Sequence, residues 1–318
     1  MKFYTLLFLI ICCSSLQAQT DADVVGFYRL RGGSHYLKSD HTFVIIGYAT
    51  FIVGTWAFEK KDKAEYSGEV IFTPYYEKDA FTIYGRQTIS NKDSTKIMFS
   101  SGFYKEETFV HIGTLNSDKP TMKRLFKRGH NEIVYPYVYK SKEKLNTVSF
   151  SFLPYSSGGT LQNYLPEIYT FSNPKNYNDF IAIHTEIDRY NQPFTYYYKD
   201  NLLHYSSKHY GEKEDLDAAL KRDGLEGDFT NFNKLLNEIY FTPKYKIVDA
   251  DSKSHAFKFE YTFSESKNAY ISKNYEEGQE YEPDFDYNNT SILYQYKRIE
   301  NVEKSKMKFT IIQEPIFK

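Results

Sequence analysis

The sequence has almost no cysteine. Of its 318 residues only Cys12 and Cys13 are cysteines, and both lie in the first apolar stretch. Once that stretch is removed, the chain contains no thiol, which excludes disulfides, a cysteine nucleophile and cysteine-ligated zinc or iron–sulfur clusters. The rest of the chain must therefore be stabilised by burying a sizeable hydrophobic core.

The sequence also lacks an apolar run long enough to cross a bilayer as a helix, which takes about 20 residues. A basic second residue, the apolar run Leu6–Cys13 and small residues up to Ala18 are typical of a signal peptide. This pattern predicts a signal peptide over residues 1–18 and export to the periplasm or the cell exterior. In the alternative, Cys12 or Cys13 becomes the lipidated first residue of a lipoprotein, but Ile11 stands where that processing prefers a small residue.

Neither sign of charge predominates, because 40 basic residues face 41 acidic ones. No basic stripe exists, so we expect no nucleic-acid partner. Zinc-peptidase, serine-hydrolase and phosphate-loop motifs are missing as well. The segment Asp284-x-Asp286-x-Asn288 begins like a calcium loop, but Asn289 and Gln295 stand where an EF-hand needs glycine and glutamate. The sequence therefore predicts no cofactor and no metal.

Aromatic residues are abundant instead, with 31 tyrosines and 26 phenylalanines. Such side chains favour pleated strands and bury a large area. Between residues 24 and 128, short alternating runs are separated by turns, without a helical period. In one run Phe81, Ile83 and Gly85 alternate with Thr82, Tyr84 and Arg86. This spacing predicts an antiparallel barrel or sandwich over residues 19–128.

The remaining residues, 129–318, are predicted to form a second β-rich domain. Phe194–Ser206 is typical of a hairpin with its turn at residues 199–201. Glu212–Arg222 has acids in its first turn and bases in its last, as the helix dipole favours. Apolar residues between Phe229 and Ile239 recur at helical spacing. We therefore expect a two-helix insertion at about residues 212–240 within this domain.

Three segments near the start carry a family resemblance. Gly26–Leu30 reads Gly-x-Tyr-x-Leu, Leu37–Phe43 reads Leu-x-x-Asp-His-Thr-Phe, and Gly54–Trp56 follows. They resemble the secreted lipocalin-like domains of Bacteroidetes-type bacteria, with Tyr28 in the place of tryptophan and His41 in the place of glycine. The resemblance implies an antiparallel lipocalin-like barrel whose interior holds a small apolar ligand. The expected fold is mainly β, with this barrel followed by the second β-rich domain.

Three residues are candidates for ligand binding. Trp56 is either a ring that contacts a ligand at the barrel mouth or a core ring that closes one end. Tyr84 is one of many tyrosines that can bind sugars or peptides when half-exposed. Arg86 follows Gly85 at a strand end, where it either meets an anionic ligand or pairs with a carboxylate.

A second polar cluster is predicted on Ile181–Asp188. Along a strand, His184, Glu186 and Asp188 fall on one face, where they could supply acid–base groups to an extracellular polymer hydrolase. The simpler interpretation is a strand with one solvated face. The favoured function is an exported, non-catalytic binding or interaction protein for a small apolar or carbohydrate ligand. The hydrolase, and a structural envelope protein without a ligand, are the alternatives.

Overall fold

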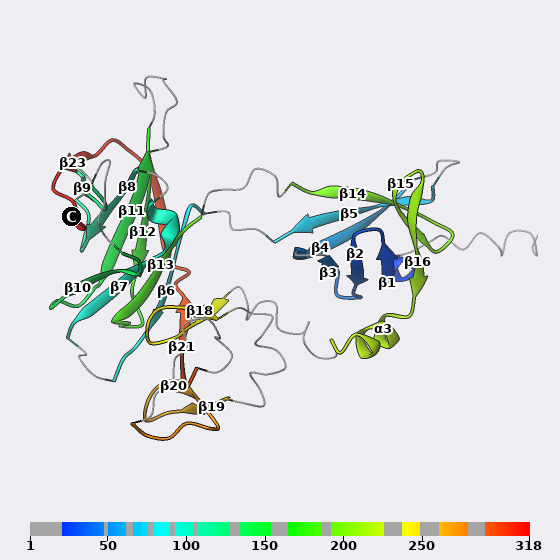
Figure 1. Cartoon of the computed structure of the whole chain (residues 1–318). Helices are drawn as coiled ribbons and strands as arrows, with labels where there is room; N and C mark the ends of the chain where they lie inside the picture. The colour runs from blue at the N-terminus through cyan, green and yellow to red at the C-terminus, as the bar shows by residue number, and fades with distance from the viewer. Residues whose placement is uncertain are drawn as a thin grey trace, which may run out of the picture. The chain divides into compact units, whose positions relative to one another are not determined.

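The computed structural model describes residues 21–318 except 48–49, 62–65, 76–78, 90–92, 105–106, 117, 128–133, 154–164, 186–191, 226–236, 249–260 and 279–289. The expected signal peptide lies outside these residues. None of the described helices combines the length and apolar character that a membrane span requires. The chain divides into two compact units (Figure 1), one of Met1–Tyr76 and Asp188–Thr230 and the other of Glu77–Ile187 and Asn231–Lys318.

The first unit, the barrel unit, is a closed barrel in which every strand pairs with its neighbours antiparallel. Its order is β1-β16-β15-β14-β5-β4-β3-β2. Strands that follow one another in the chain are therefore neighbours in the barrel, and the long insertion between β5 and β14 does not interrupt this order. The strands are β1 (Gly26–Leu30), β2 (Gly33–Leu37), β3 (Thr42–Gly47), β4 (Thr50–Lys60), β5 (Gly68–Pro74), β14 (Phe194–Lys199), β15 (Leu202–Ser206) and β16 (His209–Glu214).

Aromatic side chains fill the barrel interior. Tyr28, Phe43, Trp56, Phe72 and Tyr198 belong to one buried cluster, and the Phe43 and Phe72 rings meet edge to face at 4.9 Å. The short helix α2 (Asp21–Val24) adds Val24 to this cluster. Burial of such rings removes a large apolar area from water, which is the main source of stability in a chain without disulfides.

The helix α3 (Leu216–Arg222) packs against β1 of the barrel, where the Arg222 guanidinium lies over the Phe27 ring. Asp215 caps it by accepting a hydrogen bond of 2.8 Å from the Ala218 amide. Tyr36 donates a 2.6 Å hydrogen bond from β2 to Asp223, just after the helix. The helix begins later than the sequence predicted, because residues up to Glu214 extend β16. The second expected helix lies largely outside the described residues, and Ile239 belongs to a strand.

The second unit, the sandwich unit, contains two sheets. One has the order β10-β7-β13-β6-β21-β17-β18, with β20 on β21 and β19 on β20, and the other has the order β22-β12-β11-β8-β9-β23. The strands are β6 (Phe81–Arg86), β7 (Thr95–Phe99), β8 (Glu107–Ile112), β9 (Thr121–Arg124), β10 (Tyr137–Ser141), β11 (Thr147–Leu153), β12 (Glu167–Ser172), β13 (Asp179–His184), β17 (Glu238–Phe241), β18 (Ile247–Val248), β19 (Tyr261–Ser264), β20 (Ala269–Ser272), β21 (Ile292–Arg298), β22 (Val302–Lys306) and β23 (Thr310–Ile312).

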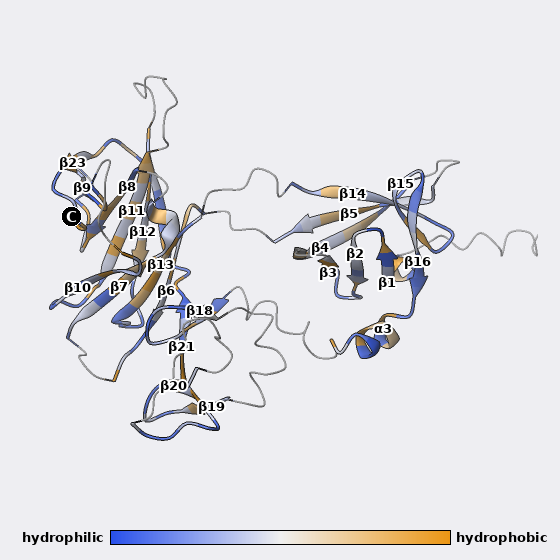
Figure 2. Cartoon of the chain, in the orientation of Figure 1, coloured by the Kyte–Doolittle hydropathy of each residue, from blue (hydrophilic) through white to orange (hydrophobic). Residues whose placement is uncertain are grey.

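The sheet that contains β6 is buried on both faces. On one face Phe81 and Phe99 meet Phe150 of the other sheet at ring distances of 5.5 and 6.2 Å. On the opposite face Tyr84 and Tyr296 belong to a separate buried cluster. Figure 2 shows hydrophobic and hydrophilic residues mixed along these strands, as alternating faces require. The predicted alternation of residues 81–86 is therefore confirmed.

The mainly β fold and the antiparallel barrel agree with the sequence, but the barrel takes different strands from those expected. The sequence placed residues 80–128 in the barrel; in the structure β6 to β9 lie in the two sheets of the sandwich unit. The barrel closes instead with β14, β15 and β16 from the expected second domain. Alternation shows that a segment is a strand, but it does not identify the partner strand, so a long insertion between β5 and β14 leaves no local signal.

Candidate functional site

A row of charged residues crosses the sheet of the sandwich unit. On β13, Asp179 lies opposite Arg86 of β6 and beside Lys96 of β7. Lys96 in turn lies opposite Lys140 of β10. Directly opposite residues share one face of a sheet, so the four side chains form a continuous row of three bases and one acid. We call them the charge row.

One end of the charge row is a buried ion pair. Arg86 Nε donates to Asp179 Oδ2 at 2.8 Å, and the two side chains are only 9% and 5% exposed. A buried charge is costly unless it is paired and hydrogen-bonded. The pair is made side-on, through Nε, rather than through the two terminal nitrogens of the guanidinium. Arg86 Nη1 instead approaches the Asn268 carbonyl oxygen at 3.5 Å.

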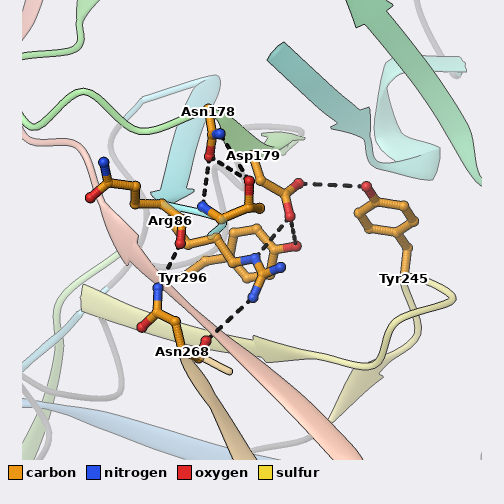
Figure 3. Close-up of polar contacts among 8 residues, drawn as sticks. Arg86, Asn178, Asp179, Tyr245, Asn268 and Tyr296 are labelled. Carbon is orange, nitrogen blue, oxygen red and sulfur yellow. Dashed lines mark hydrogen bonds and ion pairs between the residues drawn. The ribbon is translucent and has the colours of Figure 1, made fainter. Parts of the chain in front are cut away.

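Three tyrosines surround this pair, and Figure 3 shows two of them, Tyr296 and Tyr245. Tyr296 donates to Asp179 Oδ2 at 3.0 Å, and Tyr245 approaches Asp179 Oδ1 at 3.5 Å from the turn after β17. The Arg86 guanidinium carbon lies 3.4 Å from the centroid of the Tyr294 ring, a cation–π contact. Aromatic faces and hydroxyl groups therefore converge on the same two charges.

The local electrostatics keep both phenols protonated. Burial raises the pKa of Tyr296, and the adjacent Asp179 carboxylate raises it further. The pKa of Tyr245 rises for the same two reasons. Burial by itself disfavours the charged form of Arg86, but Tyr296 and Asp179 outweigh it, and the net pKa lies above the usual value. The site thus holds a permanent cation, and Tyr245 and Tyr296 remain hydrogen-bond donors.

Polar side chains fix the strand ends on either side of the pair. Asn178 Oδ1 accepts a 2.7 Å hydrogen bond from the Thr88 amide, which ties the end of β6 to the start of β13. Asn268 Nδ2 donates to the Gln87 carbonyl at 2.6 Å. Figure 3 shows both asparagines flanking Arg86. Arg86 is therefore held on both sides, which reduces the entropy lost when a ligand binds.

These groups line a cavity of about 510 Å³. Its walls include Arg86, Lys96, Asp179, Lys267 and three tyrosines. That volume lies within the range of small-molecule sites, which typically combine aromatic walls with a few placed polar groups. The cavity can therefore accept a small ligand that offers both an apolar face and hydrogen-bonding groups.

The predicted ligand-binding residues do not form one site. Arg86 lines the cavity, and its pairing with a carboxylate agrees with one of the two interpretations of its sequence. Tyr84 is buried two residues earlier on the same face, in the cluster beneath the cavity. Trp56 belongs to the barrel unit, where it is 2% exposed and donates from Nε1 to the Lys38 carbonyl at 3.0 Å. Trp56 is thus a core ring.

The predicted polar cluster around His184 also has a different environment from the one expected. His184 is 6% exposed and lies among aromatic rings, stacked on Phe81 at 4.7 Å. Its Nδ1 lies 3.1 Å from the Gly102 carbonyl oxygen. Glu186 and Asp188 lie outside the described residues. Within the described ranges, no group of three or more His, Cys, Asp or Glu side chains could hold a metal ion.

Sequence reasoning missed most of the cavity. Asp179 begins a strand whose next residues on the same face are Ile181 and Ile183. A single acid in this otherwise apolar pattern was one sequence feature that could have indicated a buried charge. The Tyr294-x-Tyr296 alternation on β21 was another. Neither signal shows that the segments meet, since β6, β13 and β21 are far apart in the chain.

The barrel interior contains a second feature that the sequence did not single out. His35 is 4% exposed, and its Nε2 is buried with no hydrogen-bond partner among the described residues. Its Nδ1 lies 3.3 Å from the Gly33 carbonyl oxygen, and its ring is 5.6 Å from that of the half-buried Tyr196. Burial lowers the pKa of His35 to about 4, so the ring is neutral near pH 7.

A comparison of this chain with protein-family models, curated proteins and solved structures found no match. The function of the cavity is therefore inferred from its own geometry.

Proposed function

We propose that this protein is an exported, non-catalytic binding protein that holds a small saccharide in the cavity around Arg86. The observation that carries the proposal is the arrangement of three tyrosines around the fixed Arg86–Asp179 pair. A sugar ring has an apolar C–H face, which packs on aromatic rings, and hydroxyl groups, which bond to charged and phenolic side chains. The signal-peptide pattern of residues 1–18 supports export.

The Asp179 environment favours binding over catalysis. Both carboxylate oxygens are engaged, one by Arg86 and Tyr296 and the other by Tyr245. Glycoside hydrolysis usually needs a pair of carboxyl groups on either side of the bond. Among the described residues that line the cavity, Asp179 is the one acid.

Titration calorimetry of the processed protein against neutral and acidic sugars, as monomers and short oligosaccharides, tests this proposal. We expect at least one saccharide to bind, and the change Tyr294→Leu to weaken that binding about tenfold or more, because an aromatic platform is lost. Tyr139→Leu is the matched control, because Tyr139 is also half-buried but packs against the core on the opposite face. No heat of binding with any sugar, or equal losses in both variants, would contradict the proposal.

A second candidate is the binding of a small amphiphilic ligand inside the barrel, which the lipocalin-like resemblance implied. The specific observation is the buried His35 Nε2. An unpaired buried polar atom costs about 1–3 kcal/mol, which a ligand hydroxyl would recover. Trp56 is the chain's single tryptophan, and it belongs to the buried cluster inside the barrel, so its fluorescence provides the readout. Fatty alcohols should change the emission of the wild type and have less effect on His35→Leu; an identical response would argue against this site.

A further inference from the structure

We infer that the ligand of the Arg86 cavity is an acidic saccharide, one that carries a carboxylate such as a uronic acid. This inference rests on the proposed function and adds the charge of the ligand. It begins from the composition of the charge row. Across four neighbouring strands the row presents Lys140, Lys96, Asp179 and Arg86, which gives three positive charges and one negative charge.

The row is unfavourable without a counter-charge. Lys96 and Lys140 lie directly opposite each other on β7 and β10, and like charges at such positions destabilise a sheet. In the described part of the chain, neither amine forms an ion pair, whereas Asp179 is already neutralised by Arg86. An anion bound on this face of the sheet, beside the two amines, would reduce the repulsion.

One more base, Lys267, belongs to the cavity wall outside the charge row. Lys267 lines the cavity, and its amine is paired with the exposed carboxylate of Glu277 at 3.4 Å. Among the described residues that line the cavity, Arg86, Lys96 and Lys267 are bases and Asp179 is the one acid, an excess of two positive charges. The lining of the cavity therefore favours an anion.

The geometry of Arg86 indicates which kind of anion fits. Because Asp179 is bound through Nε, the terminal nitrogens of the guanidinium are not used by that carboxylate. Arginine presents five N–H donors in a planar fork that matches a carboxylate. Arg86 thus has donors left for a second carboxylate, while the Tyr294 ring holds the guanidinium plane in place.

The tyrosines indicate that the anion is part of a larger ligand. A simple inorganic anion would use the bases alone and would leave the aromatic walls in contact with water. A uronic acid offers a carboxylate to Arg86 and Lys96, hydroxyl groups to the phenols and a C–H face to the rings. It therefore uses all the types of group that the cavity provides.

Titration calorimetry with matched sugars tests the inference. Galacturonic acid and its disaccharide are compared with galactose and its disaccharide, at low and at high salt. We expect the acidic sugars to bind at least about tenfold more tightly at low salt, because charge-assisted hydrogen bonds are stronger than neutral ones, and the preference to shrink as salt screens it.

Variants assign the preference to the charge row. Lys96→Gln should lower the affinity for galacturonic acid by a larger factor than the affinity for galactose, and so reduce the preference for the acid. Lys306→Gln is the control, an exposed lysine on β22 of the other sheet, and should change neither. Thermal unfolding of each variant verifies that it is folded.

The outcomes separate the two proposals. Equal affinity for the neutral and acidic sugars would overturn the inference and leave the saccharide proposal intact. Binding of inorganic sulfate as tightly as galacturonic acid would also overturn it, since the aromatic walls would then contribute nothing. No binding of any sugar would contradict the proposed function and the inference with it.

Discussion

The barrel unit and the sandwich unit use the same aromatic-rich composition in different ways. In the barrel each strand has one face inside, and the interior is filled by rings such as Tyr28, Phe43 and Phe72. In the sandwich unit the sheet that contains β6 is covered on both faces, and its second face buries the Arg86–Asp179 ion pair beside a cavity. An apolar core stabilises the first unit, whereas the second also buries an ion pair, and a costly buried charge beside a cavity is a candidate functional site.

The largest expected difference between the units concerns Asp179. Replacing Asp179 by Asn leaves Arg86 buried without its counter-charge, which should cost about 3–5 kcal/mol of unfolding free energy. The loss should fall on the sandwich unit alone. Trp56 fluorescence reports on the barrel because Trp56 is the single tryptophan, whereas circular dichroism reports on both units. In urea, the dichroism transition should move to lower denaturant and the fluorescence transition should stay in place.

A double replacement provides the control for this result. Arg86→Met combined with Asp179→Leu removes both charges and should cost less than Asp179→Asn, because no unpaired charge remains buried. If the double variant is as unstable as the single one, the charge pair is not the source of the effect.

The stability of the barrel unit should depend on pH through His35. The pKa of His35 falls from 6.5 in the unfolded chain to about 4 in the folded protein. The unfolded chain therefore binds the proton first, and stability is full above pH 6.5 and is lost as the pH falls toward 4. A shift of this size corresponds to up to about 3 kcal/mol.

Denaturation followed by Trp56 fluorescence measures this loss. His35→Leu should reduce the difference in barrel stability between neutral and acidic pH, and what remains includes the contribution of His204 on β15, whose pKa burial also lowers. His209→Leu should retain it, because the His209 ring is half-exposed and bonds to Ser206. The same pH dependence in wild type and His35→Leu would show that another group titrates.

The smallest expected effect concerns the turn between β2 and β3. His41 has a φ of 60°, a left-handed conformation that glycine adopts freely and other residues adopt at a cost. Its ring contacts Trp56 at 4.8 Å, so both His41→Gly and His41→Ala lose that contact, and only glycine relieves the strain. The glycine variant should be more stable than the alanine variant by about 1 kcal/mol. Thermal unfolding compares them; equal stability would mean that the turn is not strained.

Much of the local structure could be predicted from the sequence, because it depends on neighbouring residues. The hairpin turn was expected at residues 199–201, and Asp200 and Asn201 there have φ values of 50° and 64°, as a tight hairpin turn requires. The alternation of residues 81–86 also predicted that Phe81 and Tyr84 lie on opposite faces of their strand. The tertiary assignments could not be predicted, because the β5–β14 pairing joins residues separated by the whole inserted part of the sandwich unit.

The candidate site shows the same division. Arg86 was noticed because it follows a glycine at a strand end. Asp179 was not, because a single acid before Phe180 and Ile181 has no local pattern that identifies its partner. The Arg86–Asp179 pair depends on antiparallel register between two strands 93 residues apart in the chain, and register over such a distance is set by the packed core.

Hydrogen exchange with mass spectrometry tests the central claim most directly, because it shows in one experiment which unit binds the ligand. Exchange is measured with and without the disaccharide of galacturonic acid. We predict slower exchange in peptides that cover β6, β13 and β21 of the sandwich unit, and no change in β2, β3 and β14 of the barrel. Protection confined to the barrel strands, or no protection in either unit, would contradict the account.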